Sequence, residues 1–224
     1  MYYPKLLTAT VTSLVICSAT IAVADANSAM SQIRNDHPNL LTVDRHGQIH
    51  KIIDKQLSTG RTPLASAENF IAAFSEALSV DAREFVERGP FEDQHSHQDF
   101  MYIPETGGHK FTGVYYMQTA DGLPVYGSRL MLLVRNIHGY PGVSATTDLR
   151  DVMGYKKPAR LVQSEAVALM AAATRLGRGT TISETELMVF AGTSKEHHEP
   201  VASLVFEATQ GSAWEPETYK KLLL

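Results

Sequence analysis

Apolar and β-branched residues form two runs, one on each side of the dipeptide Asp121-Gly122. The first run covers about Lys110–Ala120, and the second covers Leu123–Asn136. An Asp-Gly pair between two such runs favours a type I′ turn, because this turn needs a positive φ at both of its central residues. The pattern therefore predicts an antiparallel hairpin.

Apolar residues at helical spacing predict two helices. The first covers Ser66–Ser79, with Ser66 as its N-cap and Glu68 in the first turn, where the helix dipole favours an anion. The second covers Glu165–Arg175 and follows Ser164 as its cap. The faces expected to be buried comprise Phe70, Ile71, Phe74, Ala77 and Leu78 in the first helix and Val167, Met170, Ala171 and Thr174 in the second.

Shorter runs predict the remaining strands. Residues 40–53 are typical of a strand, a turn at Gly47 and a second strand. The stretch after the first helix favours a short helix over Ala82–Arg88, followed by polar loops up to Gly108. A turn at His138–Gly142 leads into the next strand. The later strands are expected at 143–147, 186–191, 201–208 and 218–224.

This order of elements predicts an α+β fold with two small units, each a helix packed on an antiparallel sheet. The first unit covers residues 40–150 and the second covers 163–224, with a connector at 151–162. The hairpin argues against a purely parallel sheet, which needs crossover connections. Residues 25–39 are small and polar at first, and we expect them to form a flexible lead.

The N-terminal segment has the pattern of a secretory signal peptide over residues 1–24. Lys5 precedes the apolar segment Leu6–Ile21, and the small residues that follow predict cleavage between Ala24 and Asp25. An uncleaved anchor is the alternative interpretation. The single cysteine, Cys17, lies within the apolar segment, so the processed chain contains none, which excludes disulfides and thiol catalysis. We expect a bacterial protein that is secreted, periplasmic or held at the cell surface.

Charge and composition limit the classes of partner. The chain carries 20 basic and 24 acidic residues, for a formal net charge of −4. No Lys or Arg cluster forms a stripe along the sequence, which argues against nucleic-acid binding. No stretch after the signal is long and apolar enough to predict a membrane span.

The candidates for chemistry are few. His95, His97 and Asp99 form one polar cluster, and His197-His198 between two glutamates forms another, but neither has the spacing of a catalytic zinc site. No Gly-x-Ser-x-Gly motif or Walker loop occurs, and the paired carboxylates Glu92-Asp93 lie in a loop. We predict no catalytic, cofactor-binding or metal residue in this chain.

The aromatic residues beside the hairpin turn have two interpretations. Tyr115, Tyr116 and Tyr126 are typical of cross-strand pairs that stabilise a sheet, and the alternative is a platform for a ligand. The strand 125–135 is expected to be long, and as an exposed edge it could pair with a strand of a partner.

The chain resembles a known family of propeptides. Residues 40–149 are similar to the fungalysin/thermolysin propeptide domain in three segments: the strand pair around Gly47–His50, the helix ending at Leu78, and the hairpin. From Gln163 onward, the chain resembles a PepSY-type module that opens with Ser164–Val167. The turn at His138–Gly142 departs from the short turn of the family. The hairpin motif consists of Gln118, Asp121, Gly122, Pro124, Val125 and Gly127.

The resemblance implies a prosegment that assists the folding of a thermolysin-like zinc metallopeptidase and inhibits it, in cis or in trans. Zinc would then belong to the peptidase domain. The last strand, Tyr219–Leu224, has no polar tail after it, so we expect the second module to be incomplete and to continue in a longer precursor. A stand-alone secreted binding module of the same fold is the alternative.

Overall fold

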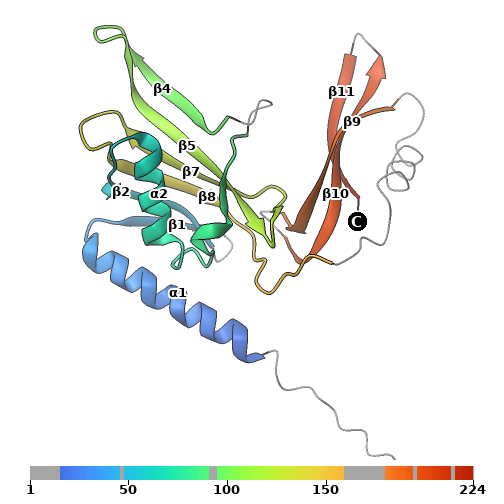
Figure 1. The fold of residues 1–224 in the computed structure, drawn as a ribbon, viewed down its shortest axis with the longest axis horizontal. Coiled ribbons are helices and arrows are strands. Elements are labelled where there is room, and N and C mark those ends of the chain that lie inside the picture. The colour runs from blue at the N-terminus through green and yellow to red at the C-terminus, as the bar shows by residue number, and fades with distance from the viewer. Residues whose placement is uncertain are drawn as a thin grey trace, which may run out of the picture.

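The computed structural model describes residues 16–45, 48–90, 95–158, 180–193, 196–212 and 215–223. In this part of the chain, the fold is mixed α/β and mostly sheet (Figure 1). A large antiparallel sheet has eight strands, and a second antiparallel sheet has three. The predicted mixture of helices and antiparallel sheets is confirmed. The finer description, two units with one helix each, does not fit clearly, because both described α-helices pack on the core of the large sheet.

The helices are α1 (Ile16–Asp36) and α2 (Pro63–Phe74), with a 3₁₀ turn at Ala82–Glu84. The large sheet contains β1 (Leu41–Arg45), β2 (Gln48–Ser58), β3 (Phe85–Glu87), β4 (His97–Ile103), β5 (Gly108–Ala120), β6 (Leu123–Pro124), β7 (Arg129–Arg135) and β8 (Gly142–Asp148). The small sheet contains β9 (Thr180–Gly192), β10 (His197–Ser212) and β11 (Glu215–Leu223).

The large sheet has the strand order β1-β2-β8-β7-β5-β3, and β4 and β6 also pair with β5. Asp121 and Gly122 have φ values of +47° and +79°, so the predicted positive-φ hairpin turn is confirmed. The expected long edge strand over 125–135 is wrong. Gly127, with φ of +68°, separates β6 from β7, and β7 lies inside the sheet between β5 and β8.

Helix α2 covers one face of this sheet with three of the predicted apolar residues, Phe70, Ile71 and Phe74. The predicted helix end at Ser79 is wrong, because α2 ends at Phe74 and the predicted positions Ala77 and Leu78 follow it. Phe70 and Phe74 are fully buried, and their rings stack with centroids 4.4 Å apart. They pack against Ile52, Leu130 and other residues that point inward from the strands. Because inward residues recur at every second position of each strand, β2, β5, β7 and β8 all contribute to one core.

The N-cap of α2 is Thr62, and the predicted cap Ser66 is wrong. The Thr62 Oγ1 accepts a hydrogen bond from the Ala65 N–H at 3.1 Å, and Pro63 takes the first helical position, where its fixed φ fits the helix. Ser66 lies inside the helix, fully buried, with its hydroxyl 2.9 Å from that of Ser58. A partner on a neighbouring strand therefore explains this polar residue.

Helix α1 replaces the flexible lead predicted for residues 25–39. Met30 and Ile33 lie three positions apart on one helix face and are buried in the core beside α2. Just beyond the helix, the His37 Nδ1 lies 2.8 Å from an Asp54 carboxylate oxygen, and the imidazole packs on Phe74. Met30 and Ile33 stand among small polar residues in the sequence, and their burial docks this segment on the core.

Other boundaries also differ from the prediction. β3 and β4 occupy stretches expected to be a short helix and a polar loop, because both pair with β5. The predicted strands of the second unit are present and longer, as β9, β10 and β11. The predicted helix Glu165–Arg175 lies outside the described residues. Neither described α-helix combines the length and apolar character needed to cross a bilayer.

We predict that Ile33→Ala lowers the free energy of unfolding by about 2–4 kcal/mol, because it removes a buried side chain and leaves a cavity. Urea unfolding followed by circular dichroism measures the change. The exposed neighbour Asn35 provides the control, since Asn35→Ala removes no buried contact. Equal stabilities of the two variants would show that residues 25–36 are not docked.

Candidate functional site at the joint between the two sheets

The hairpin motif lies where the large sheet meets the three-stranded sheet (Figure 1). We call this region the joint; it comprises residues 118–128 together with Arg150 and Val189. Its turn is exposed, and an Asp121 carboxylate oxygen accepts a hydrogen bond from the Lys157 N–H at 2.7 Å. Pro124 pairs with Thr119 across the turn. Asp121 thus holds Lys157, in the segment that leads out of the large sheet, beside the hairpin turn.

Gln118 supplies the buried centre of the joint. Its side chain is 1% exposed, and its amide makes two hydrogen bonds to the backbone of Arg150. The Gln118 Nε2 donates to the Arg150 carbonyl at 3.0 Å, and the Gln118 Oε1 accepts from the Arg150 N–H at 2.9 Å. A side-chain amide therefore replaces a strand neighbour for the segment that follows β8.

Gly127 and Arg150 form the next contact. The Gly127 carbonyl accepts a hydrogen bond from the Arg150 Nη2 at 3.3 Å. A Cβ at position 127 would lie 3.3 Å from the same nitrogen, and φ there is +68°, so glycine fits for two independent reasons. The guanidinium is buried and also bonds the Asp148 carboxylate at 2.6 Å through Nη1. No sequence pattern singled out Arg150.

Val125 joins the two sheets directly. It forms a parallel bridge with Val189 of β9, and the Tyr126 N–H donates to the Val189 carbonyl at 2.8 Å. Both valines are fully buried, in an apolar cluster with Leu123 and Val152. The break between β6 and β7 thus frees Val125 and Tyr126 to pair with the second unit.

An ion pair lies beside this cluster. The Arg88 guanidinium bonds both Glu186 carboxylate oxygens, at 2.5 and 2.7 Å. This two-pronged geometry is the strongest that an Arg–carboxylate pair adopts. Glu186 is 41% exposed, so solvent screens part of the attraction. Arg88 follows β3, and the pair therefore links the edge of the large sheet to β9.

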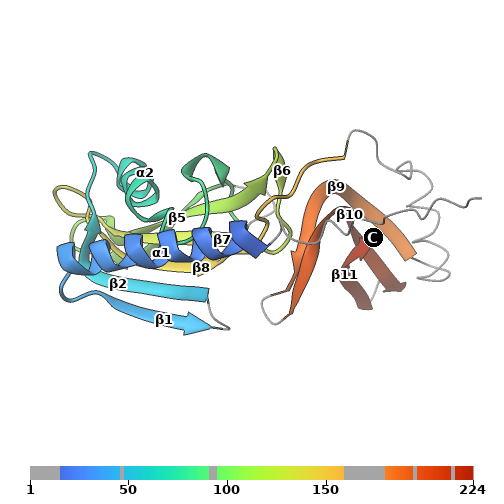
Figure 2. The ribbon, with the colours of Figure 1, turned by 90° about the horizontal axis from the view of Figure 1, so that it is seen from below.

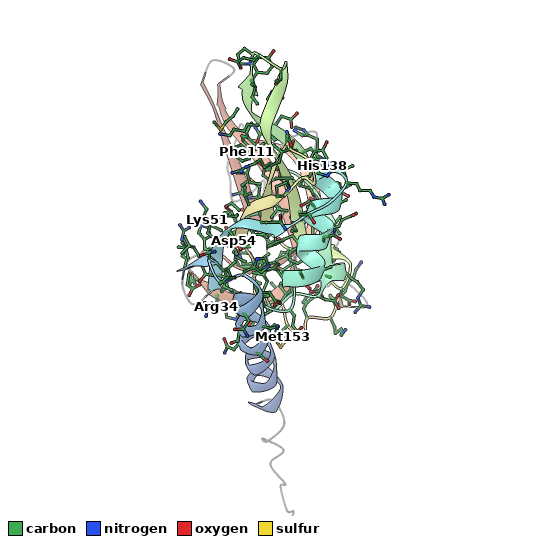
Figure 3. The ribbon with its side chains drawn as sticks, turned by 90° about the vertical axis from the view of Figure 1, so that its left-hand side faces the viewer. Arg34, Lys51, Asp54, Phe111, His138 and Met153 are labelled. Atoms are coloured by element: carbon green, nitrogen blue, oxygen red, sulfur yellow. The ribbon has the colours of Figure 1, made fainter. Side chains whose placement is uncertain are left out.

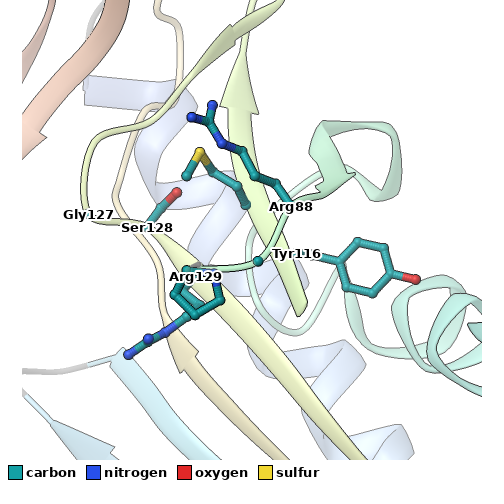
Figure 4. A pocket seen from close by; sticks show the side chains of 8 residues that line it. Arg88, Tyr116, Gly127, Ser128 and Arg129 are labelled. Carbon is teal, nitrogen blue, oxygen red and sulfur yellow. The ribbon is translucent and has the colours of Figure 1, made fainter. Parts of the chain in front are cut away.

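A pocket of about 290 Å³ opens next to the joint (Figure 4). Arg88, Tyr116, Ser128 and Arg129 are among its lining residues. The Tyr116 ring extends from the pocket toward the α2-covered face, and burial raises the pKa of its phenol. In the described part of the chain, the pocket lining brings no carboxylate or imidazole beside the Ser128 hydroxyl, which instead donates to the Val125 carbonyl at 2.8 Å.

Tyr155 packs against the apolar cluster of the joint. Burial, together with the nearby Asp121 carboxylate, raises the pKa of its phenol. The joint therefore combines apolar packing with buried polar groups that are mostly bonded to backbone.

The histidine candidates lie away from the joint. His97 is exposed on β4, with Nδ1 2.9 Å from the Ser96 hydroxyl, and the Nδ1 of His109 lies 3.6 Å from Asp99. His197 and His198 are exposed at the start of β10. The described residues contain no group of three or more potential metal ligands.

The remaining predicted site residues, Ala24 and Asp25, lie within α1. Signal cleavage between them stays a prediction. A scan against models of protein families and a comparison with curated proteins both found no match for this chain. The propeptide resemblance therefore also stays a prediction. The structure brings all six motif residues together at the joint and adds Ser128, Arg150 and Val189, which sequence reasoning did not identify.

We predict that Gln118→Ala lowers the free energy of unfolding by about 2–4 kcal/mol, because it leaves the buried N–H and carbonyl of Arg150 without partners. Denaturant unfolding gives the value. Gln56→Ala, at an exposed position of β2, removes a side chain of the same type and should change stability little. A loss in the Gln118 variant no larger than in this control would contradict the assigned role.

We expect the Arg88–Glu186 pair to contribute about 0.5–1 kcal/mol of coupling, since it is partly exposed. A double-mutant cycle of Arg88→Ala and Glu186→Ala measures this coupling separately from other effects of each truncation. The coupling should decrease when salt is added. Additive single-variant effects would show that the pair does not hold the two sheets together.

Proposed function

We propose that this chain is an exported prosegment that assists the folding of a thermolysin-like zinc metallopeptidase domain and keeps it inactive until cleavage. The observation that carries the proposal is the joint, in which the six residues of the propeptide motif connect two sheets. The Gln118 side chain bonds the backbone of Arg150, in the segment that leaves the large sheet after β8, and Val125 pairs with β9. The residues that carry the resemblance thus act together in one structural element.

Such a joint suits a prosegment that inhibits its peptidase by sterically covering the peptidase surface. Two sheets connected by buried contacts form a preorganised body, which loses less conformational entropy on docking than two loosely tethered modules would. A prosegment in the same chain as its peptidase acts at an effective concentration of about a millimolar, so modest affinity is enough in cis. In trans the same body must bind more tightly.

The role in folding follows from binding alone. A prosegment that binds the compact peptidase and not its unfolded chain shifts the equilibrium toward the compact state. The apolar segment Leu6–Ile21 and the small residues before Asp25 support export of the precursor through a signal peptide. Zinc and the catalytic residues belong, in this proposal, to the peptidase domain.

The test is a titration of the purified chain against thermolysin. We expect peptide hydrolysis to slow with increasing prosegment, and the refolding yield of the denatured peptidase to rise. Carboxypeptidase A, a zinc peptidase of a different kind, is the specificity control and should be unaffected. If the chain changes neither the activity nor the refolding yield of thermolysin, the proposed function is wrong.

A further inference from the structure

The large sheet has two faces, and α2 covers only one of them (Figure 2). Along β7, Leu130, Leu132 and Val134 point into the core and are fully buried. The alternate positions, Arg129 and Met131 among them, point to the opposite face. We call this opposite side of β1, β2, β8, β7, β5 and β4 the open face. In the described part of the chain, no helix lies on it.

Apolar and aromatic side chains adjoin one another on the open face at its β4–β5 end. The Phe100 ring of β4 lies over Gly113 of β5, where an added Cβ would meet Phe100 Cε2 at 2.8 Å. The same Cβ would lie 3.5 Å from Tyr115 Cε2 and 3.6 Å from Met131 Sδ, so these groups adjoin one another. Gly113 therefore leaves the space in which this aromatic surface packs.

The apolar surface extends to both edges of the sheet. Leu41 and Val43, on β1, are 63% and 50% exposed, and Tyr102, on β4, is 60% exposed. In register with β1, Ile53 of β2 continues the surface toward the centre of the sheet. Large apolar side chains are thus exposed at both ends of one continuous face, which is typical of an interaction surface.

The charges on the open face are cationic, although the whole chain has a net charge of −4. Lys51 lies on the side of the sheet away from α2 (Figure 3). Arg129 and Arg135 are exposed at the two ends of β7, and the Arg135 guanidinium lies 6.0 Å from the centroid of the Phe111 ring. Arg129 is close enough to the Tyr115 phenol to oppose the rise in pKa that burial causes there.

A carboxylate on the same face lies directly opposite Arg129 in the strand register. Among the described strand positions that point to the open face, Asp148 carries the carboxylate, and that group is bonded to the buried Arg150 at 2.6 Å. The described salt bridges include no pair with Lys51, Arg129 or Arg135. The open face therefore combines exposed apolar side chains on its edge strands with cations on β2 and β7, and it is complementary to a surface that carries both apolar and acidic groups.

We propose that the open face docks on the peptidase domain, against a surface that carries both apolar side chains and carboxylates. This inference rests on the proposed function and adds the surface and the chemistry of its partner. A protein partner fits better than a nucleic acid, because the centre of the face carries aliphatic and hydroxyl side chains such as Ile53 and Thr146, which provide no stacking platform. The aromatic rings gather at the β4–β5 end alone.

Charge reversal tests the surface. In Lys51→Glu/Arg135→Glu, both cations become acidic, and we expect the inhibition constant against thermolysin to weaken by about tenfold or more, mostly through slower association. The matched control is Arg61→Glu/Lys156→Glu, which changes the net charge equally at exposed positions away from the open face. Its inhibition constant should change less than about twofold. Circular dichroism verifies that both variants are folded.

A cysteine footprint locates the contact independently. In a Cys17→Ser background the chain has no cysteine, so Leu41→Cys and Tyr102→Cys each introduce a single reporter at one end of the face. We expect thermolysin to slow alkylation of both. Met153→Cys, at a residue 52% exposed elsewhere, is the control and should react at an unchanged rate.

The outcomes separate this inference from the proposed function. Inhibition by the wild-type chain that charge reversal leaves intact, or a footprint at position 153 alone, overturns the docking surface and leaves the prosegment function standing. Absence of inhibition and of any refolding effect by the wild-type chain overturns both. Single-stranded DNA and phosphatidylglycerol vesicles test for other occupants. If the wild-type chain binds one of these and not thermolysin, and Lys51→Glu/Arg135→Glu alone abolishes that binding, the inference is also overturned.

Discussion

Two hydrogen bonds from one buried amide hold the segment after β8 against the end of β5. Because the Gln118 side chain bonds both the N–H and the carbonyl of Arg150, that residue is bound as a strand partner would bind it. Arg150 in turn reaches the Gly127 carbonyl and the Asp148 carboxylate. The path of the chain before β7 and the path after β8 therefore depend on each other. The Val125 N–H donates to the Gln118 carbonyl at 2.8 Å, so the residue that bridges to Val189 is bonded to the same glutamine.

The sequence was sufficient for elements whose cause is local. Asp121-Gly122 predicts its own turn, and the spacing of Phe70 and Phe74 predicts the buried face of α2, because turn geometry and helical period act over a few residues. The sequence predicts the wrong first residue for α2. Ser66 and Thr62 are both good N-cap residues, and only the tertiary contact of Ser66 with Ser58 distinguishes them. α1 was missed because its anchors, Met30 and Ile33, stand among small polar residues.

The candidate site shows the same limit. Gln118 and Gly127 were found through the motif, but a motif does not state what a residue bonds to. Arg150 and Val189 are distant in sequence, and neither belongs to a local pattern, so nothing short of the fold brings them to the hairpin. The cationic open face has the same origin. Lys51, Arg129 and Arg135 are scattered along the chain, and sheet register alone gathers them on one side.

The position of β8 has a consequence for the order in which the chain folds. β8 lies between β2 and β7, and hydrogen bonds across the β2–β8 boundary join residues such as Ile49 and Thr147, which are 98 residues apart. Pairings this distant carry a large loop-closure cost and are formed late. The hairpins β1–β2 and β7–β8 pair residues that are close in sequence, but the edge of β2 stays unpaired until the chain has been made as far as Asp148. A chain emerging stepwise from a ribosome would thus keep this edge of β2 open until most of the first unit has appeared.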